Sequence, residues 1–76
     1  MNQLNLIFEF VNVFQNQIER IDFDINRNKE NQIAGIIQLN PNANLERMEN
    51  YLIENKFNSE FDYWEIDKEK LFIEME

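Results

Sequence analysis

The sequence predicts an α+β fold in which two helices pack on one antiparallel sheet of four strands, in the chain order α-β-β-α-β-β. Three patterns predict this class. Polar residues recur at helical spacing over residues 2–20, apolar and polar residues alternate over residues 21–39, and a second helical segment followed by a hairpin pattern completes the chain. The length of 76 residues fits a single small acidic domain over residues 1–76.

The first segment, residues 2–20, alternates in part like a strand, but its polar residues form a single stripe only on a helix. Its apolar residues form a row at heptad spacing, Leu4, Ile7, Val11, Phe14, Ile18 and Ile21, and a second set beside that row, Leu6, Phe10 and Val13. Such an apolar arc is wide for a surface helix. Either the helix packs on several sides within the domain, or the second set forms an oligomer face.

Residues 21–27 alternate cleanly and predict a half-buried strand whose aspartates point outward. Residues 26–31 are expected to form the turn, and residues 32–39 the second strand. Gly35 lies inside this second strand, which predicts a bulge or the close approach of another element.

A second helix is expected to begin with Asn40 as its cap and Pro41 at the first helical position, where the missing N–H costs nothing. It is expected to end at Asn55 or Asn58. Its inner row is Leu45, Met48 and Leu52, helped by Tyr51 and Ile53.

The last segment predicts a hairpin with arms over residues 61–66 and 71–75 and with the residues DKEK as its turn. The Asn-Gly pair typical of tight hairpins is absent, so the loop is expected to be longer than two residues.

Asp22 and Asp24 resemble the start of a calcium loop, which needs Gly at position 6 and Glu at position 12. Counted from Asp22, those positions hold Arg27 and Ile33, and the count from Asp24 fails at the same two places. The pattern therefore indicates the solvated face of a strand.

The chain has no cysteine and no histidine, which removes the usual ligands of zinc, copper and non-haem iron. A magnesium or manganese site made of carboxylates alone is the metal site left open. The single serine, Ser59, has no histidine to activate it, and no glycine-rich phosphate loop is present. We therefore expect no enzyme activity, no cofactor and no metal.

Fifteen acidic residues against seven basic ones give a formal net charge of −8. Nucleic acids and anionic membranes both attract cationic proteins, so this balance argues against either as a direct partner. The sequence contains no apolar run long enough to span a membrane and no signal-peptide pattern. The expected location is the cytoplasm.

The acids concentrate at the C-terminal end, where residues 60–76 hold seven acids and two lysines, or −5 of the total −8. Aromatic residues are interleaved with them. Carboxylates steer an encounter with a basic protein, and aromatic side chains supply the desolvated anchors. The candidate partner-binding residues are Asp22, Asp24, Asp62, Trp64, Glu65, Asp67, Glu69 and Glu74. The alternative is a hairpin with one core face and a charged outer edge that discourages aggregation.

Size, charge and the lack of catalytic groups favour a stoichiometric inhibitor of a basic nuclease or another nucleic-acid-binding protein. In these general properties the chain is similar to small acidic phage counter-defence proteins of the anti-CRISPR and anti-restriction kind, and to bacterial immunity proteins and antitoxins. No motif carries this similarity. The host compartment would then be a bacterial cytoplasm. The alternative is a structural or assembly protein that forms a homodimer or larger oligomer through the first helix.

Overall fold

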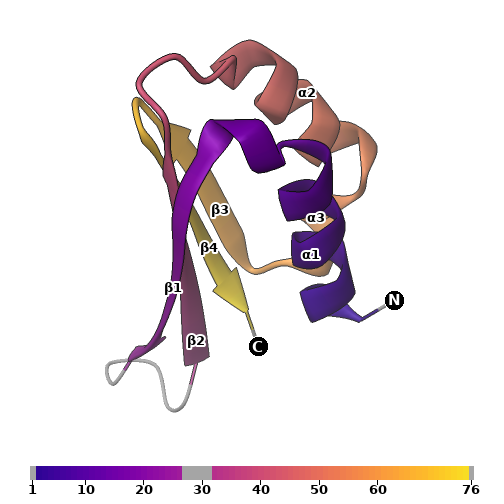
Figure 1. Cartoon of the computed structure of the whole chain (residues 1–76). Coiled ribbons are helices and arrows are strands. Elements are labelled where there is room, and N and C mark those ends of the chain that lie inside the picture. Colours follow the sequence, from indigo (N-terminus) through magenta and orange to yellow (C-terminus); the bar gives the residue numbers. More distant parts are fainter. Residues whose placement is uncertain (1, 27–31, 76) are drawn as a thin grey trace.

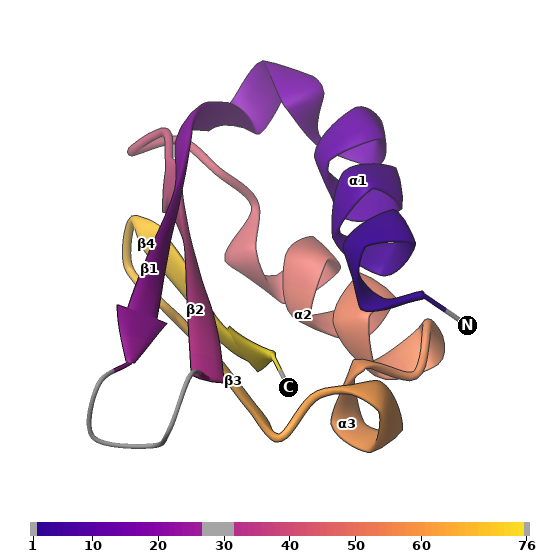
Figure 2. The same cartoon turned by 90° about the horizontal axis from the view of Figure 1, so that it is seen from below.

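The computed structural model describes residues 2–26 and 32–75 (Figure 1). Its elements are α1 (Gln3–Val13), the 3₁₀ turn η1 (Gln15–Gln17), β1 (Ile18–Asn26), β2 (Gln32–Leu39), α2 (Leu45–Glu54), α3 (Phe57–Glu60), β3 (Tyr63–Asp67) and β4 (Lys70–Met75). The strands form one antiparallel sheet in the order β1-β2-β4-β3. The helices lie on one side of it (Figure 2), which confirms the predicted α+β class.

The strand register decides which residues share a face of the sheet. Two rows run across the inner face, which the helices cover: Phe23, Gly35, Ile73 and Trp64, then Ile21, Ile37, Leu71 and Ile66. Two rows run across the opposite face: Asp22, Ile36, Phe72 and Glu65, then Asp24, Ala34, Glu74 and Tyr63. The predicted alternation of strand residues is therefore confirmed for both hairpin pairs.

The hydrophobic core lies between the inner face and the helices. From α1 and the turn after it, the buried residues are Leu6, Ile7, Phe10 and Phe14. Phe10 and Phe14 meet each other and Tyr51 of α2, with ring centroids 5.0 to 5.9 Å apart. Leu6 and Phe10 therefore do not form the oligomer face predicted with Val13, because they are buried within one chain.

The first helix is shorter than predicted, because it ends at Val13 and β1 begins at Ile18. Asn40 holds the chain where it passes from α1 into β1. Its backbone N–H donates to the Gln17 carbonyl at 2.8 Å, and its side-chain amide donates to the Asn16 carbonyl at 2.9 Å. A β-bulge follows directly after Ile18. Beyond the bulge, Ile21, which continues the apolar row of the predicted first helix, belongs to the sheet.

The predicted start of the second helix is also wrong. The Ala43 N–H donates to the Asn40 carbonyl at 3.0 Å, so Pro41 lies in a β-turn, where its fixed φ is favourable. Asn44 is the actual cap, and its side chain accepts from the Arg47 N–H at 3.1 Å. The predicted end at Asn55 is confirmed.

A short helix that the sequence pattern did not predict, α3, follows a left-handed residue, Lys56, with φ of 67°. It buries Phe57 and allows Phe61 to enter the core. Ile53, predicted for the inner row of the second helix, is exposed instead.

The loop between β3 and β4 has two residues, which corrects the prediction of a longer one, since Asp67 pairs directly with Lys70. Lys68 supplies the positive φ, 45°, that such a tight turn needs. Gly35 has no bulge beside it, and the close approach predicted there is made by the Phe23 ring. The predicted turn over 26–31 falls, apart from Asn26, outside the described residues.

Candidate protein-binding surface

One face of the sheet is not covered by any helix within residues 2–26 and 32–75 (Figure 2). We call this surface the open face. Alternate residues of all four strands project from it, because antiparallel pairing keeps directly opposed side chains on the same side. Residues that are far apart in the sequence are thereby gathered on one surface.

The open face carries carboxylates from three strands. Asp22 and Asp24 come from β1, Glu65 and Asp67 from β3, and Glu74 from β4. The sequence could not decide whether the two aspartates of the first strand join the acids of the C-terminal hairpin. The register answers this question, because both groups project from the same side.

Two basic residues share the open face with these acids. Arg20 donates through Nε to Asp22 Oδ2 at 2.8 Å, and both side chains are well exposed. Lys70 stands opposite Asp67 on the neighbouring strand. The five carboxylates therefore exceed the two cations, and an exposed ion pair such as Arg20–Asp22 costs little to rearrange.

The centre of the open face is apolar. Ile36 and Phe72 are neighbours on β2 and β4, and both are half-buried. Tyr63 lies next to Phe72, with ring centroids 6.1 Å apart, and is exposed. Glu74 is only 8% exposed beside them. An apolar centre with a polar border is the usual layout of a protein–protein interface.

The Tyr63 hydroxyl donates to Glu65 Oε2 at 2.7 Å. This hydrogen bond is the main cause of the raised pKa of the Tyr63 phenol, followed by partial burial and by the nearby carboxylates of Glu65 and Glu74. Through this hydrogen bond the Tyr63 hydroxyl holds the Glu65 carboxylate in place at the edge of the apolar centre.

The open face is hollowed next to the β3–β4 turn, where a depression of about 460 Å³ is lined by Gln38, Glu65, Asp67, Lys68, Glu69, Lys70 and Phe72. Phe72 connects this depression to the apolar centre. Glu69 lies here in the two-residue loop, so it belongs to the end of the surface and not to its strand rows.

Two residues of the predicted set lie elsewhere. Trp64 projects from the inner face, packs against the core and donates from Nε1 to Asn58 Oδ1 at 2.8 Å. Asp62 lies in the bend before β3. Neither residue is part of the open face. The apolar residues beside the acids are instead Ile36, Tyr63 and Phe72. Alternation along the strands would have indicated them, because Leu71 and Ile73, on either side of Phe72, face the core.

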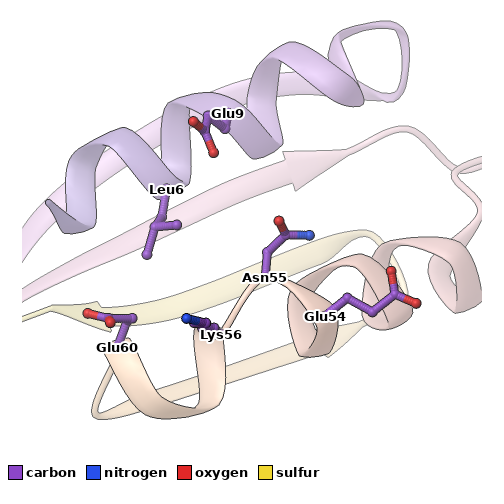
Figure 3. A pocket seen from close by; sticks show the side chains of 6 residues that line it. All are labelled: Leu6, Glu9, Glu54, Asn55, Lys56 and Glu60. Carbon is purple, nitrogen blue, oxygen red and sulfur yellow. The ribbon is translucent and has the colours of Figure 1, made fainter. Parts of the chain in front are cut away.

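A second depression, of about 280 Å³, lies on the helix side between α1 and the α2–α3 connection (Figure 3). Its lining comprises Leu6, Glu9, Glu54, Asn55, Lys56 and Glu60. The lining thus includes one basic residue and three acidic residues, one from each of α1, α2 and α3. It is separate from the open face, because the sheet and the core lie between the two.

In the part of the chain that the structure describes, no group of three or more acidic residues is arranged to hold a metal ion. Among the same residues, no helix has the length and apolar character needed to cross a membrane. Fold and surface thus define an α+β protein whose sheet is covered on one side and acidic on the other. No family model, curated protein or solved structure matches the chain.

Proposed function

We propose that this protein is a stoichiometric inhibitor that binds a basic nuclease or another nucleic-acid-binding protein through its open face. One observation carries the proposal: the strand register gathers four exposed carboxylates, Asp22, Asp24, Glu65 and Asp67, around the apolar centre of an uncovered sheet face. The protein acts by occupying its target, and the proposal assigns it no catalytic step.

The charge of the chain selects the kind of partner. A net charge of −8 repels nucleic acids and attracts proteins that present arginine and lysine. On the open face the border carboxylates stand where they meet such side chains first. Phe72, Tyr63 and Ile36 then provide the area that is desolvated on docking, which contributes most of the binding energy at protein interfaces.

Inhibition follows from competition for the same groups. A nuclease or other nucleic-acid-binding protein holds phosphates with clustered arginine and lysine side chains. Carboxylates that pair with those side chains exclude the phosphates. This mode of action fits a phage counter-defence protein or a nuclease immunity protein that acts inside a bacterial host cell.

The test compares two variants with the same change of charge. Glu65→Lys with Asp67→Lys reverses two acids of the open face, and Glu46→Lys with Glu49→Lys reverses two exposed acids of α2 on the helix side. Proteins retained from a bacterial lysate at low salt are purified, and each is titrated alone with both variants and with the wild type. Competition by DNA and by added salt is measured for each purified protein.

We expect the open-face variant to bind at least about tenfold more weakly than the α2 variant. Wild-type binding should weaken as salt increases and should exclude DNA from the purified protein. Equal binding by the two variants, or simultaneous binding of DNA at full affinity, contradicts the proposal.

A further inference from the structure

We propose that a second copy of this chain pairs with the outer edge of β1 and covers an apolar patch beside it. The proposal does not depend on the function above: it needs the outer edge of β1 and the inner side of the sheet, and of the open face it uses only Arg20 and Asp22 next to that edge. The patch, called the α1–β1 patch, consists of Leu4, Phe8, Phe23 and Ile33, each between 39 and 54% exposed.

The members of the α1–β1 patch come from adjoining elements. Leu4 and Phe8 lie one turn apart on the same flank of α1. Leu4 and Ile33 line a common depression of about 310 Å³ with Asn2, Gln3 and Met75. The ring of Phe23, from β1, lies over Gly35 of β2 on the inner face of the sheet. The patch is therefore continuous from the helix to the margin of the sheet.

Charge argues for a second copy as the occupant and not for a basic partner. The whole of α1 contains one charged residue, Glu9, and its side chain belongs to the depression on the other flank of the helix (Figure 3). A chain with a net charge of −8 approaches itself most easily through a surface without charge. A basic partner, by contrast, finds no carboxylate here to steer it.

The edge beside the patch is open. Among the described strands, β1 is an outer strand of the sheet and pairs with β2 alone. An outer strand of nine residues offers unpaired backbone groups that another strand can use. When identical strands meet at such an edge with two-fold symmetry, only the residue on the axis opposes its own copy, and a residue before the axis opposes the residue equally far after it in the other strand.

The charges of β1 favour a register centred on Ile21. With Ile21 opposite Ile21 of the copy, Arg20 stands opposite the copy's Asp22, and the reciprocal pair forms as well. A register centred on Asp22 would place two aspartates opposite each other. A register centred on Phe23 would place Asp22 opposite Asp24. Of these three registers, only the one centred on Ile21 avoids opposed acids next to the two-fold axis and forms the two Arg20–Asp22 pairs.

The resulting dimer has a continuous sheet of eight strands. Phe23 of each chain then lies close to the other chain, and the α1–β1 patches of the two chains shield each other from water. The open faces stay uncovered and become adjacent halves of one larger acidic surface.

A disulfide cross-link tests the register directly, because the natural chain has no cysteine. Directly opposed residues of antiparallel strands have Cα atoms about 4.5 to 5.5 Å apart, which is within the range for a disulfide. Ile21→Cys should therefore form a covalent dimer under mild oxidation. Asp67→Cys on β3, the other outer strand, is the matched control and should remain a monomer.

Sedimentation of variants without cysteine tests the charges and the patch. Arg20→Asp should raise the dimer dissociation constant about tenfold or more, and Arg20→Asp combined with Asp22→Arg should restore it. Phe8→Glu should also weaken the dimer. A wild type that stays monomeric up to millimolar concentration overturns the proposal. Cross-linking by Asp67→Cys that equals or exceeds that by Ile21→Cys overturns it too.

Discussion

The aromatic ring of Phe23 lies against Gly35 on the neighbouring strand. A Cβ placed on Gly35 would stand 3.5 Å from Cε1 and 3.7 Å from Cδ1 of that ring. These are ordinary contact distances, and the φ of Gly35 is not positive. The glycine therefore allows the ring to lie across the second strand, but its backbone does not require glycine.

Gly35→Ala should fold normally and be more stable by about 0.4–1 kcal/mol, since alanine restricts the unfolded chain and its Cβ finds room. Gly35→Val should destabilise the protein, because the extra methyl groups need the space that the Phe23 ring occupies. Urea unfolding of the two variants gives both values. A large loss of stability on Gly35→Ala would contradict the geometry described for this contact.

Leu52 and Ile53 are neighbours on α2 with opposite environments: Leu52 is fully buried and Ile53 is exposed. Leu52→Ala should reduce the free energy of unfolding by about 2–5 kcal/mol, because it leaves a cavity in the core. Ile53→Ala should change it by less than about 1 kcal/mol. Thermal or urea unfolding measures the pair, and similar costs for both would show that α2 is rotated from the orientation described here.

Asn44 caps α2 through the hydrogen bond from the Arg47 N–H. Asn44→Ala should cost about 1 kcal/mol of stability, because it leaves an N–H of the first turn without its partner. The matched control is Asn50→Ala, on the exposed surface of the same helix, where alanine has the higher helix propensity. If Asn50→Ala proves more harmful than Asn44→Ala, the cap assignment is wrong.

The pKa of the Tyr51 phenol is raised, first by burial and second by the carboxylate of Glu9. Above a pH of about 10 the unfolded chain loses this proton first, so the folded state binds more protons and stability falls as pH rises. The contribution is complete below the unfolded pKa and is lost as pH passes through the folded pKa.

Tyr51→Phe keeps the ring contacts with Phe10 and Phe14 but removes the proton. The variant should lose less stability than the wild type between about pH 9 and pH 11. Melting temperatures measured across this range make the comparison, and the lysines, which also titrate there, are common to both proteins. Parallel pH profiles would exclude Tyr51 as a source of alkaline instability.

The predicted class and element order are confirmed, because the alternation in residues 21–39 and 63–75 fixes two pairs of strands and their faces. The border between the first helix and the first strand could not be predicted. Ile18 and Ile21 fit the apolar row of a helix as well as the inner face of a strand, and hydrogen bonds from Asn40, more than twenty residues away, decide between them.

The candidate surface was predicted in part. Asp22, Asp24, Glu65, Asp67 and Glu74 project from one face, but their meeting depends on strand order, which a single sequence does not contain. Trp64 is interleaved with the C-terminal acids in the sequence, yet it projects from the inner face and its indole N–H is satisfied by Asn58 on the helix side. The prediction of an oligomer face at Leu6 and Phe10 is wrong because helical periodicity does not reveal how many neighbours a helix has, and both residues are buried.

The strand order β1-β2-β4-β3 also shapes the folding pathway. Each outer strand pairs with the strand next to it in the sequence, whereas the central β2–β4 pairing joins Ile33 to Met75 and Gln38 to Lys70. Loop closure must precede the gain from such distant contacts, so we expect the central pairing to be the slow step of folding. The central strands are thus expected to pair last. The refolding rate should therefore change most on substitution of Ile37 and Leu71, which pair with each other there.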